Sequence, residues 1–391
     1  MLTPNRIEVE IDGAVHHHWK SYDIDSDFLI PADAFSFELG VASDNNVLPN
    51  FAGKSAKVFI NGSLVMTGIV DTTEHNLKKG QRTYNINGRD YASILLDCSA
   101  PITNVKGLTL IDAVRKIATP LGIKNIELKA ESNPKLDKVD IDIGETAWEA
   151  IKRCANSAGL HPWFSADGIL IIGGADYSSP PVATLCCMKN GEKNNFSEAQ
   201  VTFDVSQRYS EVTFLGQTHG KLDDDNKNDL KWVWKDTSMQ VYKPKTVVLG
   251  DVENLEALKK HAKKQLSDWK LDEFSLKIIV PDHKMQDGTL WQTGQRVHII
   301  IEEYEIDAIF FLMGRRFMLS RTGGTQTELR FKQDGVWTPD AYPDKSEKAR
   351  HRRGKKGKDD NSTSKSKRRK GRKSKRAKKA RAEEIVLGLE E

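Results

Sequence analysis

The sequence predicts a mainly β protein of the α+β class, with two related small antiparallel β-barrels, inserted α/β domains and a disordered basic C-terminal tail. Three observations lead to this fold class. Strand-type alternation fills the first 100 residues, helical periodicity begins after Gly107, and strand patterns return further along. The chain of 391 residues is 38% hydrophobic, which is enough for several domains with buried cores.

The first β-barrel domain is predicted over residues 1–100. "RIEVEIDG" alternates apolar and polar residues and ends at the turn Asp12-Gly13, and "FSFELGVAS" and "QRTYNINGRD" alternate in the same way. "SAKVFINGSLVMTGIVDTTEH" contains two strands around Asn61-Gly62. This dipeptide is a strong hairpin signal because both of its residues tolerate positive φ.

An α/β domain is predicted over residues 101–178. "LTLIDAVRKIATPLGI" has the spacing of a helix that ends at Pro120 and Gly122, and "TAWEAIKRCANSAGL" that of a second helix, ending at Gly159. The strand "KVDIDIG" lies between them. "HPWFSADGILIIGG" follows as a hairpin across Asp167-Gly168.

A second β-barrel domain is predicted from residues 179–220 and 270–344. Its strands include "SEVTFLGQT", "SLKIIVPDH", "QRVHIIIEEYEID", "AIFFLMGRRFMLS" and "TQTELRFK". Residues 221–269 are predicted to form an inserted polar and helical segment, with the long helix "ENLEALKKHAKKQLSDWKLDEF". Two β regions separated by insertions indicate a duplicated small barrel.

Charge is divided unevenly along the chain. Residues 345–381 contain 20 Lys and Arg against 3 Asp and Glu, a net charge of +17, and residues 382–391 contain four Glu. The whole chain has a formal net charge of +4, which leaves −9 on residues 1–344. Because a run of like charge with little apolar surface cannot form a core, residues 345–391 are predicted to be a flexible tail on an acidic body.

The tail ends in a short apolar segment with acidic flanks, "EEIVLGLEE". A disordered tether with such a tip is suited to holding a partner, by strand addition or as a short helix. The basic run also suits a phosphate backbone, which it would attract without reading sequence, or an acidic protein surface. A solvated tail without a partner is the remaining alternative. The candidate partner-binding residues are Ile385, Val386, Leu387 and Leu389 at the tip, with Lys367, Arg368, Arg369, Lys370, Arg372 and Lys373 in the basic run.

No metal, cofactor or catalytic site is predicted. His16, His17 and His18 are consecutive, so on a strand they point to alternate faces and cannot all reach one ion. "DDDNKND" at residues 223–229 lacks the glycine and the late glutamate of a calcium loop. The pair Cys186-Cys187 is interpreted as two buried small residues rather than a redox switch. Phosphate-binding and nucleophile motifs are missing from the sequence.

Export and membrane insertion are not expected either. The N-terminus has no apolar signal-peptide core, and no segment has the ~18 apolar residues of a membrane span. Four cysteines in a chain of this size do not make a disulfide framework, which fits synthesis in a reducing compartment.

Several segments, taken in order, resemble the baseplate hub proteins of Mu-like contractile-tailed phages. "RIEVEIDG…FSFELG", "VFINGSLVMTGIVDTTEH" and "YNINGRDYASILLDCSAPI" are similar to the first domain of that family, including Gly88-Arg89 and Asp97-Cys98-Ser99. "LTLIDAVRKIATPLGI" and "TAWEAIKRCANSAGLHPWFSADGILII" resemble its second domain, and "RFMLSRTGGTQTELRF" its closing strands. The resemblance covers residues 5–340, but the basic tail has no counterpart in it.

The resemblance implies a structural role without catalysis. It implies a virion protein that is related to the amino-terminal part of type VI secretion spikes and is assembled in the host cytoplasm. Three copies would form a ring whose two tube-like barrels per subunit match a sixfold tail tube and a threefold central spike. Implied partners are further copies of the chain and the tube and spike proteins. The tape-measure protein is a further candidate partner, which the unmatched basic tail could reach. The alternative function is nucleic-acid binding through the basic tail, and a cell-wall hydrolase is a third reading.

Overall fold

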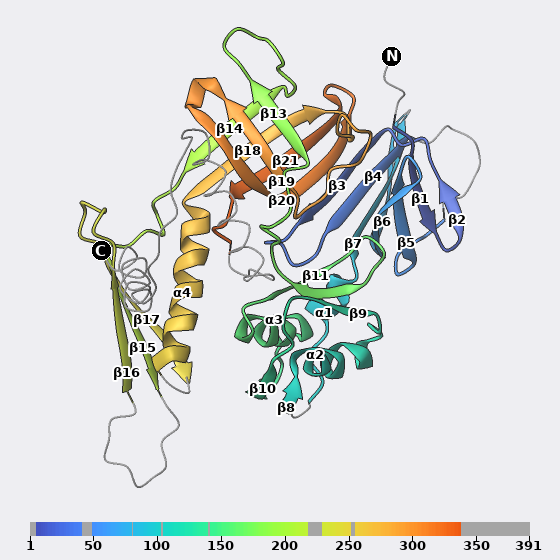
Figure 1. Ribbon diagram of the computed structural model, residues 1–391. Coiled ribbons are helices and arrows are strands. Elements are labelled where there is room, and N and C mark those ends of the chain that lie inside the picture. The colour runs from blue at the N-terminus through green and yellow to red at the C-terminus, as the bar shows by residue number, and fades with distance from the viewer. Residues whose placement is uncertain are drawn as a thin grey trace, which may run out of the picture. The chain divides into compact units, whose positions relative to one another are not determined.

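The computed structural model describes residues 5–40, 49–79, 81–102, 105–139, 141–217, 229–251 and 255–337 (Figure 1). The chain divides into two compact units. The first unit combines Met1–Thr202 with Phe274–Glu347, and the described residues of the second unit lie within Phe203–Glu273. Within the described ranges, no helix is both long and apolar enough to cross a membrane.

The first unit is built on a 13-stranded sheet. Its main strand order is β14-β18-β21-β20-β3-β4-β7-β6-β5-β1-β2, and β13 and β19 branch from β20. The N-terminal strands are β1 (Ile7–Ile11), β2 (Ala14–His16), β3 (Ser21–Asp27), β4 (Ala34–Gly40), β5 (Ser55–Ile60), β6 (Ser63–Lys78) and β7 (Gln81–Asp90). The later strands are β13 (Ala183–Cys187), β14 (Glu198–Phe203), β18 (Phe274–Pro281), β19 (Arg296–Ile301), β20 (Ile306–Ser320) and β21 (Gly324–Gln333).

Period-two patterning explains these strands. In β1, Ile7, Val9 and Ile11 are buried and the two glutamates between them are half-buried. The predicted hairpin turn is confirmed at Asn61 and Gly62, whose φ angles of 52° and 80° match a type I′ turn. One apolar core cluster contains side chains from both halves of the sheet, among them Ile24, Val58 and Leu329.

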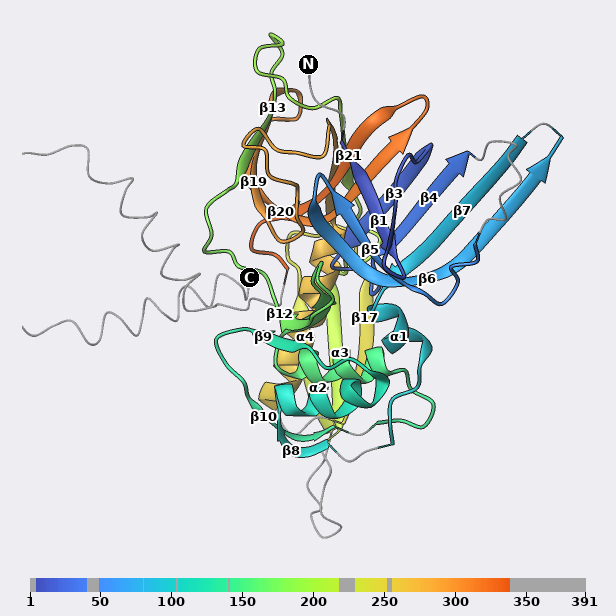
Figure 2. The same ribbon diagram turned by 90° about the vertical axis from the view of Figure 1, so that its right-hand side faces the viewer.

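The two halves of the chain meet in this one sheet through the antiparallel pair β3–β20 (Figure 2). The register places Gly314 opposite Asp27 and Met318 opposite Asp23. Between the described strands, no hydrogen-bonded pairing closes either half on itself. The mainly β fold is thus confirmed, and the closure into two barrels remains a prediction.

The α/β module of the first unit packs three helices around a second core. The helices are α1 (Ala92–Asp97), α2 (Leu110–Ala118) and α3 (Ala147–Ser157), and a 3-10 turn, η1 (Thr119–Leu121), follows α2. The strands are β8 (Val105–Thr109), β9 (Ile126–Lys129), β10 (Lys135–Val139), β11 (His161–Phe164) and β12 (Leu170–Gly173). Both predicted helices are confirmed.

Local signals set the limits of these helices. The Thr146 hydroxyl accepts from the Glu149 backbone N–H at 3.2 Å, and the Glu149 carboxylate accepts from the Thr146 N–H at 3.3 Å, which completes a capping box. After α2 the chain turns at Gly122, where φ is 89°. The strand predicted in "KVDIDIG" lies earlier than expected, in β10, where it pairs with β8.

The second unit is a three-stranded sheet with one long helix. β15 (Glu211–Gln217) lies between β16 (Asp229–Lys235) and β17 (Pro244–Asp251), and α4 (Leu255–Asp272) follows. This unit is wider than the predicted insertion 221–269, since it also contains β15. The reason is packing: Val212 and Phe214 of β15 are buried with Leu258 and Ala262 of α4.

Candidate functional site

A row of ion pairs lies on one face of the sheet where β3 pairs with β20, which is called the joint between the two halves. Asp23, Asp25 and Asp27 alternate along β3 and therefore project from one face of the sheet. Arg316 of β20 donates to Asp23 at 2.7 Å. Arg330 of β21 donates to Asp25 at 3.2 Å and lies 2.9 Å from the Asp27 carboxylate. Two arginines thus tie three successive carboxylates across three strands, which fixes the register between the halves.

Gly314 makes room for this arrangement. It stands between Asp27 and Arg330 in the register of the three strands. A Cβ at Gly314 would lie 2.3 Å from Asp27 Oδ2 and 2.7 Å from Arg330 Nε. These distances are shorter than any ordinary contact, so the guanidinium reaches Asp27 only because residue 314 has no side chain.

A second polar contact between the halves is centred on His283, which is fully buried. The Thr327 hydroxyl donates to the Asp282 carbonyl at 2.6 Å, so it accepts from His283 Nδ1–H at 2.9 Å. His283 Nε2 then accepts from the Tyr22 hydroxyl at 2.8 Å. Burial lowers the His283 pKa to about 4. The histidine is therefore neutral at pH 7 and links β3 to β21.

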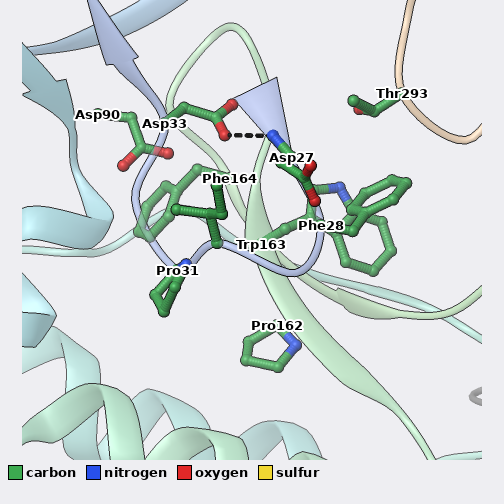
Figure 3. A pocket seen from close by; sticks show the side chains of 10 residues that line it. Asp27, Phe28, Pro31, Asp33, Asp90, Pro162, Trp163, Phe164 and Thr293 are labelled. Carbon is green, nitrogen blue, oxygen red and sulfur yellow. Dashed lines mark hydrogen bonds between the residues drawn. The ribbon is translucent and has the colours of Figure 1, made fainter. Parts of the chain in front are cut away.

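Beside the joint lies a small hollow with a volume of about 20 Å³, lined by carboxylates and aromatic rings (Figure 3). Asp33 Oδ1 accepts from the Asp27 backbone N–H at 3.0 Å. Across the hollow, the rings of Phe28 and Trp163 meet edge to face with centroids 5.1 Å apart. Because Trp163 belongs to β11, this contact attaches the α/β module to the large sheet.

Two of the carboxyl groups of the hollow, Asp33 and Asp90, have raised pKa values. Burial raises the Asp33 pKa to about 7. Burial and the charge of Asp33 raise the Asp90 pKa well above its usual value. Arg315 is also buried, and burial lowers its pKa to about 10, so it remains charged. Among the described residues, no group of three or more His, Cys, Asp or Glu side chains is arranged to hold a metal ion.

The predicted tail residues lie outside the described residues, the last of which is Trp337. This applies to the tip residues Ile385, Val386, Leu387 and Leu389 and to the basic residues Lys367, Arg368, Arg369, Lys370, Arg372 and Lys373. The polar run 223–229 also falls outside, except for Asp229 at the start of β16.

The other candidate motifs lie at separate places in the first unit. His16 pairs with Val9 at the end of β2, and its ring contacts Phe51 at 5.0 Å. Cys186 is buried in β13 and Cys187 is half-buried, and both thiols are free. Sequence reasoning missed the joint. Its signals were the alternating aspartates of "SYDIDSD" and the paired arginines of "MGRRF".

Four family models match successive parts of the chain. Residues 6–90 match the N-terminal domain of Mu phage baseplate assembly protein GpP-like proteins. Residues 92–174 match the second domain of baseplate hub protein gp44-like proteins. Residues 208–266 match the third domain of NMB1110-like tail proteins, and residues 268–336 match a tail protein C-terminal domain.

Individual proteins agree with these matches. The chain is 54% identical to the tail protein from Neisseria meningitidis MC58, with a TM-score of 0.81 over 87% of this chain and 100% of that one. Baseplate hub protein gp44 of Escherichia phage Mu is 22% identical over 88% of this chain and 92% of its own length. The prophage MuSo2 43 kDa tail protein from Shewanella oneidensis shares the fold. It is 20% identical, with a TM-score of 0.75 over 85% of this chain and 99% of that one.

The succession of matched domains and the 54% identity to the Neisseria tail protein agree with the resemblance found in the sequence, so the chain belongs to the family of Mu-like phage tail proteins that includes the gp44-like baseplate hub proteins.

Proposed function

We propose that this protein is the structural hub of a contractile-tail baseplate. Three copies form a ring, and each copy contributes two related sheet halves, closed as barrels in the assembly. The ring therefore presents six similar β units to a sixfold tail tube and three subunits to a central spike. This role is mechanical and needs no catalytic group. It places the protein in the tail baseplate of the virion, after assembly in the host cytoplasm.

The joint between β3 and β20 is the observation that carries this proposal. An adaptor under load requires that its two β units keep a fixed relative position. Antiparallel pairing from Asp27 to Tyr22, the ion pairs of Arg316 and Arg330, and the His283 network all connect the two halves. Because so many contacts connect the two halves at once, we expect them to move as one rigid body and not as two hinged domains.

We assign the tail a tethering role. The basic run 345–381 does not collapse entirely onto the acidic body, because salt screens their attraction over ~10 Å, and it therefore serves as a solvated tether for the tip. Ile385, Val386, Leu387 and Leu389 then bind a neighbouring component of the baseplate. The candidates are another copy of this chain, the spike, the tube and the tape-measure protein in the lumen.

Light scattering of the purified full chain and of residues 1–344 tests the ring. A mass of three subunits is expected for both, because the proposal places assembly in the folded body. A monomer in both, including after mixing with the spike and tube proteins, contradicts the ring. Clearing of cell walls by the purified chain would contradict a purely structural role.

Nucleic-acid binding is the second candidate function, and the net charge of +17 on residues 345–381 favours it. Such a segment predicts DNA affinity that falls steeply with salt, without preference for sequence. DNA affinity is measured at 50 and 200 mM salt for the full chain and for residues 1–344. Nucleic-acid binding by the tail predicts a strong, salt-dependent affinity in the full chain alone. Equal affinity of the two proteins would exclude the tail as a DNA-binding element.

A further inference from the structure

The sheet of the second unit has one covered and one open face. α4 packs along one face, where Val212 and Phe214 are buried (Figure 1). The side chains of the opposite face come from alternate positions of the three strands, and the register brings them into neighbouring rows. Thr213 lies opposite Val233, and Leu215 lies between Lys231 and Val248.

This open face carries apolar side chains that the described residues leave uncovered. Val248 is 71% exposed and Val233 is 36% exposed, while Leu215 is half-buried. Lys231 and Lys235, both exposed, follow the edge strand β16 on the same face, and Lys235 also pairs with Glu211 at 3.0 Å. The result is a short apolar strip with lysines along one side. An antiparallel sheet can leave one face in water, but that face is then usually polar.

The core on the covered side is small. Four apolar residues of the described part of this unit form its fully buried cluster, and eight partly buried ones pack against them, among them Trp232, Trp234 and Trp269. A unit of this size gains little stability from so small a core, so a further layer on the open face would add to it.

We propose that the acidic-flanked apolar tip, residues 383–391, binds the open face of the β15–β17 sheet in its own or a neighbouring copy of the chain. The proposal rests on the tethering role assigned above to the tail, and it does not depend on the ring. The tip has four apolar side chains between two pairs of glutamates. The open face offers an apolar strip with Lys231 and Lys235 at its side. The apolar side chains of the tip can therefore contact the apolar strip while its glutamates lie near the two lysines.

The chain between the last described residue and the tip is long enough for this contact. Residues 338–382 would span roughly 35 Å as a random coil, and more when their like charges repel. A folded unit of about 70 residues has a radius of gyration of only about 11 Å. A tether of this length holds the tip at an effective concentration in the millimolar range, so a weak contact is sufficient.

Hydrogen exchange of the full-length protein, followed by mass spectrometry, tests the proposal. The amides of residues 383–391 should exchange at least tenfold more slowly than in a free peptide of the same sequence. Val248→Glu places a negative charge on the open face and should return the tip to the rate of the free peptide. The matched control is Val241→Glu, since Val241 is 67% exposed in the same unit but lies outside the three strands. This control should keep the slow exchange.

Free-peptide exchange in the unmodified chain, or slow exchange that persists in Val248→Glu, would overturn the proposal. The second result would show that another component or surface covers the tip. The amides of α4 report whether each variant is folded. If Val248→Glu perturbs them, Thr246→Glu on the same face replaces it, with the same expectation. The number of subunits in the assembly, measured by light scattering, should be the same in all of these variants. A missing trimer would therefore count against the ring and not against this site.

Discussion

Gly314→Ala should weaken the joint between the two sheet halves, where β20 pairs with β3. The new Cβ would lie 2.3 Å from Asp27 Oδ2 and 2.7 Å from two Arg330 nitrogens, so the ion pair must separate. The Asp27 side chain is only 9% exposed, and loss of its cation leaves a nearly buried carboxylate. Breaking a buried pair costs 3–5 kcal/mol. We expect a loss of about 3 kcal/mol, because Asp27 still accepts from the Leu29 backbone N–H at 2.8 Å.

Urea unfolding of the purified protein measures this loss, and Gly323→Ala is the matched control. A Cβ at Gly323 would meet only the side-chain ends of exposed Ser320 and half-buried Gln326, which can move aside. The control should therefore lose less than about 0.5 kcal/mol. Equal losses in the two variants would refute the argument that Arg330 reaches Asp27 across a position that excludes a side chain.

Three further predictions concern protonation and capping. Because the His283 pKa is lowered in the folded protein, its neutral side chain contributes fully to the free energy of unfolding above pH 6.5, and this contribution is lost as the pH falls towards 4. Between pH 7.5 and 5 the loss is about 2 kcal/mol. His283→Gln should not show this loss, and the free energies of unfolding of both proteins, measured across this pH range, test the expectation. Parallel pH profiles of the two proteins would contradict a neutral buried histidine. The pH dependence from Asp33 has the opposite sign, since its raised pKa favours the folded state as the pH falls. As the pH rises from 5 to 8, Asp33→Asn should therefore gain stability relative to the unmodified protein. No such relative gain would count against a buried carboxyl. Thr146→Ala removes the capping box of α3 and should cost about 1 kcal/mol in thermal unfolding, whereas Thr146→Ser should cost much less; similar melting temperatures for the two would argue against the cap.

Short-range features of this fold were predictable because their causes are local. The turn at Asn61 and Gly62 needs two residues that accept positive φ, and the α3 start needs Thr146 and Glu149 three positions apart. Both signals can be read without knowing the rest of the chain. Pairing between distant strands has no such signal. Asp25 and Arg330 are 305 residues apart, and neither side chain indicates its partner.

The same distinction applies to the candidate sites. A charge run is visible in composition alone, so the basic tail and its apolar tip stand out in the sequence. The open face does not, because β15 has the alternation expected of any half-buried strand. Only the pairing of Glu211–Gln217 with β16 and β17 shows that it leaves the large sheet and lies under α4.

The pairing of β3 with β20 also has a consequence during synthesis. β3 is complete at Asp27, but its partner begins at Ile306. At 5–20 residues per second, the ribosome takes roughly 15–60 s to supply that partner. During this time β3 presents an unpaired edge, and many nascent copies on one messenger would present the same edge to one another. Asp23, Asp25 and Asp27 give that edge three like charges, which oppose pairing between two copies. The carboxylates that hold the finished sheet together would thus also keep unfinished chains apart until their own arginines arrive.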